Sequence, residues 1–296
     1  MSKPSSPSPA KPKSVLSRAV DVSTVSTPYI KINIYGVNRV GKTTLACTFP
    51  KPLLLISFEP AEAGGAESVA DVPGVMFLQD QKHFTGTKGF QAIVDELKSD
   101  TGYKTVVLDG LTSMQDRILA EQLGLDKLPE QQEFGGVGKV TYQKRSEMMK
   151  EALRPFMGLK KNLVVLAKEK DHRPKEDKEK MDFTPAFLRK MGLDSYYASE
   201  VGGSIAGWVQ DVCPYIVRMF LAPEVVTKKI KVPGTNKEVE RTEETGRTIH
   251  RLRILYHPNF ATGSRTLRSI NLPEYLDEPD YEKIVKTFKG TLSKGE

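Results

Sequence analysis

One stretch of the chain combines glycine, lysine and threonine at a spacing that can hold a phosphate group. Residues 36–43 read GVNRVGKT and fit the pattern G-x-x-x-x-G-K-[ST]. In such a loop the glycines let the backbone curve so that successive N–H groups point at one phosphate, and the lysine reaches the β- and γ-phosphates. The hydroxyl after the lysine can bind Mg²⁺. The predicted nucleotide-binding residues are Gly36, Val37, Asn38, Arg39, Val40, Gly41, Lys42, Thr43 and Thr44.

The segments on both sides of this loop supply the context that the pattern requires. Ile30, Ile32 and Ile34 alternate along a short apolar stretch before the loop, which predicts a strand, and residues 44–47 can begin a helix. A strand, a glycine loop and the start of a helix therefore follow in order. The alternative is a glycine turn that binds no ligand, and the flanking pattern favours the phosphate loop.

Two carboxylates follow apolar stretches that are typical of strands buried in a parallel sheet. Residues 52–58 (PLLLISF) precede Glu59, and residues 105–109 (TVVLD) end in Asp109. Open α/β sheets bind ligands at the carboxyl ends of their strands. Glu59 is therefore predicted to polarise the water that attacks the γ-phosphate, and Asp109 to hold Mg²⁺ through water. For Glu59 the alternative is a carboxylate that caps the following turn.

Two basic residues are predicted to contact the γ-phosphate. Lys168 follows a third apolar strand, residues 163–167, at the same end of the predicted sheet. Arg265 follows the last predicted strands, from where an arginine could reach the γ-phosphate in its own subunit or across an interface. An ordinary surface position is the alternative for this arginine. With Lys42 and Glu59, these residues form the predicted catalytic set.

The remaining segments predict an α/β fold with a mostly parallel central sheet and helices on both faces. Apolar residues recur at helical spacing between the predicted strands, as in residues 143–158. Residues 214–221 predict a fourth strand, and the alternating residues 224–256 surround a Pro-Gly turn and predict a β-hairpin at one edge of the sheet. The end of the chain predicts a turn at residues 272–276 and a closing helix at residues 280–288.

The charge balance is compatible with a polyanionic partner. The 296 residues carry a formal net charge of +7, and the pI is about 9.1. A basic surface without such a partner is a comparable alternative. Lys139 could contact a nucleic-acid phosphate, and Tyr142, Tyr196 and Tyr197 could stack on bases. Trp208 lies on an amphipathic helical pattern and is predicted to belong to the core.

Composition predicts one large domain with flexible ends. Residues 1–27 are rich in Ser, Pro and Lys and are predicted to be disordered, residues 28–290 to form the P-loop ATPase domain, and residues 291–296 to be flexible. No apolar segment approaches ~18 residues and no secretory signal is evident, so no membrane contact is expected. The isolated Cys47 and Cys213 favour a reducing compartment, which predicts a cytoplasmic protein.

These motifs together resemble the RecA-like ATPase core. The resemblance rests on GVNRVGKTTLA, LLISFEP, KTVVLDGLTSM, VVLAKEK and HPNFATGSR, and it covers about residues 29–290. More narrowly, the chain is similar to phage-encoded RecA-like proteins of single-strand annealing and recombination. Two features depart from the RecA pattern: Lys168 stands where a polar amide is common, and a separate N-terminal oligomerisation domain is not evident.

The resemblance implies the activity and the partners. It implies ATP and Mg²⁺ as cofactors, DNA-stimulated ATP hydrolysis, and action on single-stranded DNA in annealing or strand exchange. It also implies a ring or filament of identical subunits in the host cell cytoplasm, and a single-strand-binding protein as a further candidate partner. A nucleotide-dependent switch or loader is the alternative function. In that case the N-terminal tail would recruit a replication or recombination partner.

Overall fold

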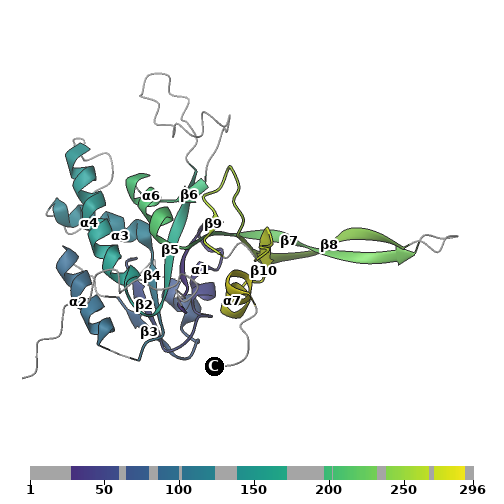
Figure 1. Cartoon of the computed structure of the whole chain (residues 1–296), viewed down its shortest axis with the longest axis horizontal. Coiled ribbons are helices and arrows are strands. Elements are labelled where there is room, and N and C mark those ends of the chain that lie inside the picture. Colours follow the sequence, from purple (N-terminus) through teal and green to yellow (C-terminus); the bar gives the residue numbers. More distant parts are fainter. Residues whose placement is uncertain are drawn as a thin grey trace, which may run out of the picture.

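A single mixed sheet forms the centre of the molecule (Figure 1). The computed structural model describes residues 28–59, 65–79, 86–99, 102–123, 139–171, 197–201, 203–231, 238–266 and 270–290. Eight strands lie side by side in the order β10-β8-β7-β1-β5-β4-β2-β3, while β6 pairs with β5 and β9 with β7. Their bounds are β1 Lys31–Gly36, β2 Leu53–Ser57, β3 Val75–Leu78, β4 Thr105–Asp109, β5 Asn162–Asp171, β6 Tyr197–Ser199, β7 Tyr215–Lys231, β8 Glu238–Arg253, β9 Gly263–Ser264 and β10 Tyr275–Asp277.

Most neighbouring strands of the sheet are parallel. Parallel pairing joins β7 to β1, β1 to β5, β5 to β4, β4 to β2 and β2 to β3. The carboxyl ends of these six strands therefore lie at one edge of the sheet, where open α/β sheets bind ligands. Strands β8 and β10 extend the sheet by antiparallel pairing. The predicted α/β fold, with a hairpin at one side of a mostly parallel sheet, is confirmed.

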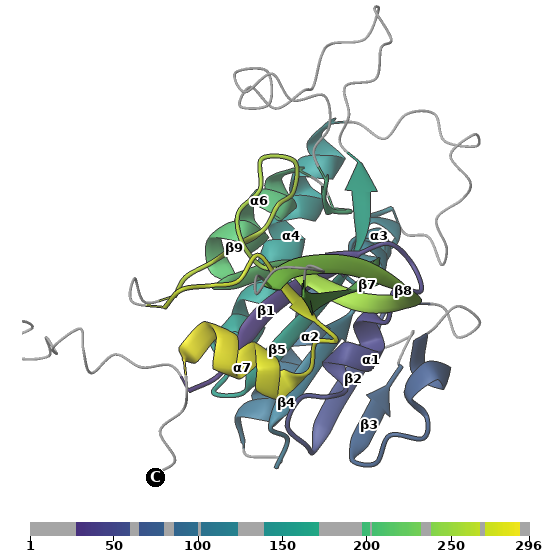
Figure 2. The same ribbon diagram turned by 90° about the vertical axis from the view of Figure 1, so that its right-hand side faces the viewer.

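Helices cover both faces of the sheet (Figures 1 and 2). One face packs against α2, α3, α4 and α6, and the other packs against α1, α7 and the short 3₁₀ helix η4. The bounds are α1 Lys42–Ala46, η4 Gly65–Val69, α2 Gly86–Lys98, α3 Leu111–Gln122, α4 Lys139–Met157, α6 Gly203–Val212 and α7 Tyr281–Lys289.

Alternation of side chains along the strands divides the apolar residues between two cores. On β1, Ile34 enters the core beneath α1 and α7, while Tyr35 enters the larger core beneath the other helices. Trp208 of α6 packs against the larger core, as predicted. Cys47 and Cys213 are free and buried. Burial raises the pKa of Cys47 to about 11 and that of Cys213 to about 12, so both thiols stay protonated at neutral pH.

Two segments differ from the sequence-based expectation. Residues 214–221 and the first half of the predicted hairpin form one continuous strand, β7, because the chain passes Pro223 through a register shift instead of turning there. A turn is predicted at residues 272–276, but Tyr275 and Leu276 belong to β10, which pairs with β8. Both differences involve strand pairing with residues outside the segment itself, which a local sequence pattern does not predict.

The outer parts of β7 and β8 form a two-stranded ribbon that projects from the body (Figure 1). Only the first residues of β7 pair with β1, and only Arg251–Arg253 of β8 pair with β10. Beyond them the two strands pair with each other up to Lys231 and Glu238. Glu243 joins the strands by accepting from Lys228 at 3.2 Å. The ribbon is therefore held by its own cross-strand pairs.

Some predictions fall on residues that the structure does not describe. The predicted N-terminal tail, residues 1–27, and the C-terminal residues 291–296 lie outside the described residues. Within the described part of the chain, no helix is both long enough and apolar enough to cross a lipid bilayer.

Gly36 joins the end of β1 closely to β7, and this approach yields a test of the fold. A Cβ atom at this position would lie 2.2 Å from the backbone oxygen of Met219. We expect Gly36→Ala to lower the free energy of unfolding by about 1–3 kcal/mol, because the two strands must separate. Urea unfolding followed by circular dichroism measures the change. Gly207→Ala in α6 is the matched control: its Cβ would meet nothing within 4 Å, so stability should stay equal or rise. Equal stabilities for the parent and Gly36→Ala would contradict the prediction.

Candidate nucleotide-binding site

The parallel register brings the predicted site residues together at the carboxyl edge of the sheet. Gly36 at the end of β1 pairs with Lys168 of β5, and Asp109 at the end of β4 lies opposite Leu166 of β5. A cavity of about 670 Å³ opens there. The cavity is lined by the phosphate loop, Glu59, Asp109 and Lys168, which the sequence predicted, and by Gly65, Ser68, Gly110, Thr112, Leu166 and Ala167.

The phosphate loop has the backbone shape that its sequence predicted. Gly41 has φ 83°, in the left-handed region that favours glycine, and α1 begins at the next residue. The Lys42 ammonium donates to the carbonyl oxygens of Gly36 at 2.9 Å and Val37 at 2.7 Å. Burial lowers the pKa of Lys42, while Asp109 acts in the opposite direction. These contacts hold the ammonium inside the curve of the loop, where it can meet phosphate oxygens.

Thr43 and Asp109 form the part of the site that suits a divalent cation. The Thr43 hydroxyl donates to Oδ2 of Asp109 at 2.9 Å. Burial raises the pKa of Asp109, while the hydrogen bond from Thr43 opposes that shift. Mg²⁺ prefers hard oxygen ligands and commonly takes only one or two of them from the protein, with phosphates and water supplying the rest. A hydroxyl and a carboxylate beside a phosphate loop therefore fit Mg²⁺.

A close backbone approach fixes the wall of the site beside Thr43. A Cβ atom on Gly65, the first residue of η4, would lie 3.0 Å from the Thr43 hydroxyl oxygen. Glycine at this position lets η4 lie directly against the start of α1. Sequence reasoning missed Gly65 as a residue of the site. The pattern after β2 carried no signal that this residue would meet the hydroxyl.

Glu59 is held by two residues of neighbouring elements. Its Oε1 accepts from the hydroxyl of Ser113 in α3 at 2.7 Å and lies 3.4 Å from the ammonium of Lys168. Both contacts use Oε1 and orient the carboxylate at the cavity. Sequence reasoning assigned Lys168 to the γ-phosphate, and the structure places it at the cavity in contact with Glu59. Sequence reasoning missed Ser113, whose only signal was a hydroxyl in the first turn of the helix after Asp109.

Arg265 lies at the amino end of β7, away from the carboxyl edge of the sheet. Its backbone N–H donates to the carbonyl of Pro214 at 2.8 Å, and its guanidinium donates to the carbonyl of Asp211. Both partners precede β7, whose first residue pairs with Ile32, the second residue of β1. The phosphate loop leaves the opposite end of β1. The structure therefore does not bring Arg265 to the cavity of its own subunit, and a contact across a subunit interface stays a prediction.

Of the four predicted DNA contacts, the structure describes the side chain of Tyr197 alone. The ring of Tyr197 in β6 stacks on Phe260 at 5.4 Å, and the guanidinium of Arg218 lies 5.8 Å from the Tyr197 ring centre. Tyr196 lies outside the described residues. Lys139 and Tyr142 belong to α4, but the structure does not describe their side chains.

The comparison with known families agrees with this geometry. The family described as AAA domain matches residues 29–253, which is most of the chain and includes the phosphate loop, Glu59, Asp109 and Lys168. No curated protein matches the chain. The chain therefore belongs to the AAA domain family and is a P-loop NTPase.

Proposed function

We propose that this protein is a Mg²⁺-dependent ATPase that acts on single-stranded DNA in phage recombination, by annealing or strand exchange. The observation that carries the ATPase part is the meeting of Lys42, the Thr43–Asp109 pair and Glu59 around one cavity. The phosphate loop serves nucleotide binding alone, whereas a carboxylate beside it supplies a base for hydrolysis.

The chemistry follows from where the polar groups lie. Lys42 and the N–H groups at the start of α1 would bind the β- and γ-phosphate oxygens, and Thr43 and Asp109 would hold Mg²⁺. A bound Mg²⁺ neutralises charge that develops on the phosphates. Glu59 would take a proton from water as the water oxygen bonds to the γ-phosphorus and the bond to the β-phosphate oxygen breaks. The products are ADP and inorganic phosphate.

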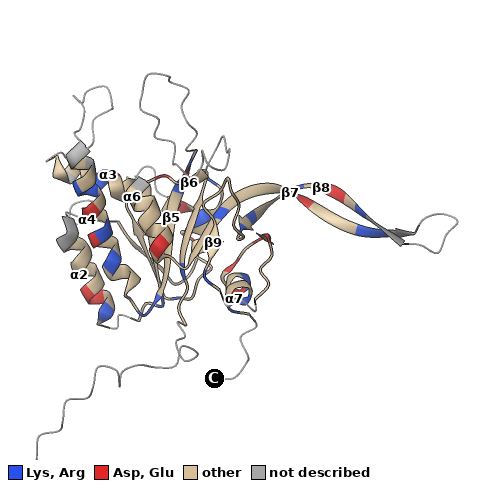
Figure 3. Ribbon diagram, turned by 45° about the horizontal axis from the view of Figure 1, so that its top comes forward, with Lys and Arg blue, Asp and Glu red and all other residues tan. Residues whose placement is uncertain are grey.

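The DNA part of the proposal is supported by charge and by the resemblance noted above. The chain carries a net charge of +7, and lysine and arginine are distributed over several elements of the body and the ribbon (Figure 3). Phosphate contacts made by such residues favour nucleic acids without regard to sequence. Assembly into a ring or filament would place several such surfaces along one strand, and a single-strand-binding protein could deliver the DNA.

The projecting ribbon favours a second candidate function, a nucleotide-dependent switch or loader that recruits a replication or recombination partner. In the described part of the ribbon, basic and acidic residues are interspersed: Lys228 and Arg241 both lie within 4.0 Å of Glu243. Mixed charge suits a protein partner better than a polyanion. In this function the nucleotide would select a conformation, and DNA would not affect hydrolysis.

Measurement of ATP hydrolysis separates these two functions. We expect Lys42→Ala to abolish hydrolysis, and Glu59→Gln to lower kcat by roughly 10²-fold or more while ATP still binds, because the general base is lost. Steady-state release of phosphate, with and without single-stranded DNA, measures both effects. Stimulation by DNA supports recombination. Hydrolysis that needs Lys42 but ignores DNA favours the switch, and hydrolysis that survives Lys42→Ala would overturn the assigned site.

Ser113 generates another prediction, because its hydroxyl orients Glu59. We expect Ser113→Ala to lower kcat about tenfold with little change in KM for ATP, since the Glu59 carboxylate loses one of the two contacts that orient it. Ser99→Ala is the matched control, because the Ser99 hydroxyl donates to the backbone of Glu96 on α2. An unchanged kcat in Ser113→Ala would show that Glu59 does not depend on this contact.

A further prediction concerns DNA itself. We expect a labelled oligonucleotide to bind the protein at low salt, and the logarithm of the binding constant to fall linearly with the logarithm of salt concentration, because phosphate contacts release counterions. Fluorescence anisotropy with and without ATP measures this. An absence of binding at low salt in both conditions would exclude the DNA part of the proposal.

A further inference from the structure

The phosphate loop has a second neighbour, on the side away from the catalytic residues. In the sheet order, β5 and β4 lie on one side of β1 and carry Lys168 and Asp109, while β7 and β8 lie on the other side. The phosphate loop holds the α- and β-phosphates, and the nucleoside is attached to the α-phosphate. With the γ-phosphate near Lys168 and Asp109, the nucleoside lies at the other end of the triphosphate. The nucleoside is therefore expected toward β7 and β8.

His250 of β8 occupies that side of the loop. A Cβ atom on Gly41 would lie 3.2 Å from Nε2 and 3.3 Å from Cδ2 of His250, so the imidazole lies directly against the loop backbone. The His250 side chain nevertheless keeps 44% of its surface exposed. A planar ring fixed beside a phosphate loop and still open to solvent can pack against a base.

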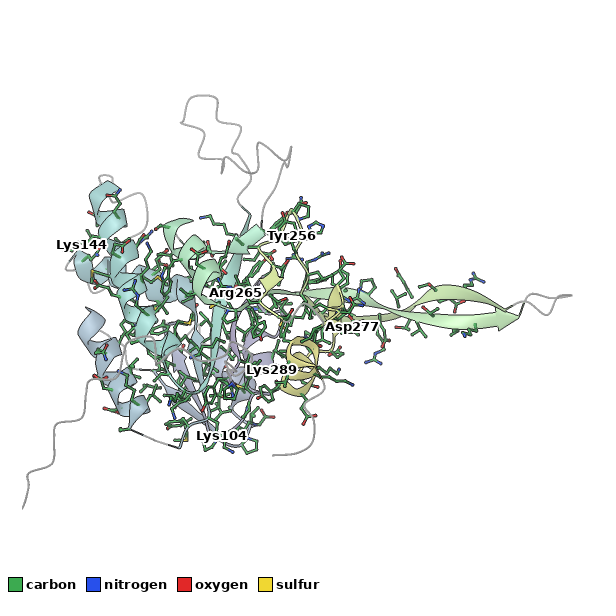
Figure 4. All side chains as sticks on the ribbon, viewed as in Figure 1. Lys104, Lys144, Tyr256, Arg265, Asp277 and Lys289 are labelled. Carbon is green, nitrogen blue, oxygen red and sulfur yellow. The ribbon has the colours of Figure 1, made fainter. Side chains whose placement is uncertain are left out.

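Glu278 lies beside this imidazole and is anchored by backbone contacts. Its N–H donates to the carbonyl of His250 at 2.8 Å, and its carboxylate accepts from the His250 backbone N–H at 3.2 Å. Its Oε2 lies 3.5 Å from Nδ1 of His250, and the carboxylate is 53% exposed. The Lys283 ammonium donates to the Glu278 carbonyl at 2.6 Å. Asp277, the residue before it, lies near the base of the ribbon (Figure 4).

The start of α1 continues this surface. Thr44 of α1 and Thr48, two residues after α1 ends, are exposed. The Thr48 hydroxyl oxygen accepts from the backbone N–H of Tyr281 at 2.9 Å, so the turn after α1 is joined to the start of α7. Contacts with the phosphate loop, β8 and the C-terminal segment thus position His250 and Glu278 beside the loop, on the side toward which the nucleoside is expected.

We propose that His250 and Glu278 form the nucleoside subsite of this protein, with the base packed on the His250 imidazole and a nucleoside N–H or O–H donated to the Glu278 carboxylate. This inference rests on the nucleotide binding proposed above. The hydrogen-bond donor is either an amino group of the base or a ribose hydroxyl, and the two have the same chemistry toward a carboxylate. Glu278 lies outside residues 29–253, so the segment that follows the family match would contribute to nucleotide selection.

Calorimetric titration of the full chain with Mg·ADP and with Mg·tripolyphosphate tests the subsite, because the second ligand has no nucleoside. We expect His250→Ala to weaken ADP binding about tenfold, the loss of one stacking contact, and to leave tripolyphosphate binding unchanged. His257→Ala is the matched control, since His257 lies after the end of β8 and its ring packs on Phe260 at 4.9 Å. It should bind both ligands as the parent does.

Glu278→Gln identifies the donor. If the base amino group donates, the variant should lose affinity for ADP but not for inosine diphosphate. If a ribose hydroxyl donates, the variant should lose affinity for both ADP and inosine diphosphate. It should then bind 2′-deoxy-ADP or 3′-deoxy-ADP, whichever lacks the donating hydroxyl, as tightly as the parent does.

Three outcomes would overturn the inference or its basis. Equal losses of ADP and tripolyphosphate affinity in His250→Ala would show that His250 only supports the loop. Unchanged ADP affinity in both His250→Ala and Glu278→Gln would place the nucleoside elsewhere. If the parent binds neither ligand, or if Lys42→Ala binds both as the parent does, the proposed nucleotide site itself fails and the subsite fails with it.

Discussion

The hydrogen bond from Thr43 to Asp109 joins the two halves of the site, and the rest of the structure is arranged so that it can form. Thr43 is the second residue of α1, which follows the phosphate loop, and Asp109 ends β4, which is separated from β1 by β5. The pair meets only because the three strands are parallel and in a register that aligns their carboxyl ends. Burial increases the contribution of this hydrogen bond, because little water is available to hydrogen-bond the Asp109 carboxylate in place of Thr43.

Close backbone contacts hold the loop in place around that pair. Gly36 lets β1 approach β7, Gly41 lets the loop approach His250, and Gly65 lets η4 approach Thr43. A Cβ atom at each of these three positions would come close to a backbone oxygen or to a polar side chain of the neighbouring element. Gly36 and Gly41 shape the loop for phosphate, and together with Gly65 they allow β7, β8 and η4 to pack closely against the loop and the start of α1. Small displacements of those elements would therefore reach the loop directly.

The same contacts relate the site to the ribbon. Met219 and His250, which lie against the loop, belong to the two strands that continue into the ribbon. A bound nucleotide that touches His250 would contact the base of an element that extends far from the body (Figure 1). This arrangement is compatible with both proposed functions, because action on DNA and recruitment of a partner each require the nucleotide to influence a distant surface.

The sequence by itself determined the phosphate loop, the strands that carry Glu59, Asp109 and Lys168, and the α/β class, because these depend on local spacing and on apolar stretches. Tertiary structure decided the rest. It joined Ser113 and Lys168 to the same oxygen of Glu59, placed Arg265 at the far end of the sheet, and brought His250 to Gly41. Such contacts join residues far apart in the chain, and their positions follow from strand order and register, which a local pattern does not contain.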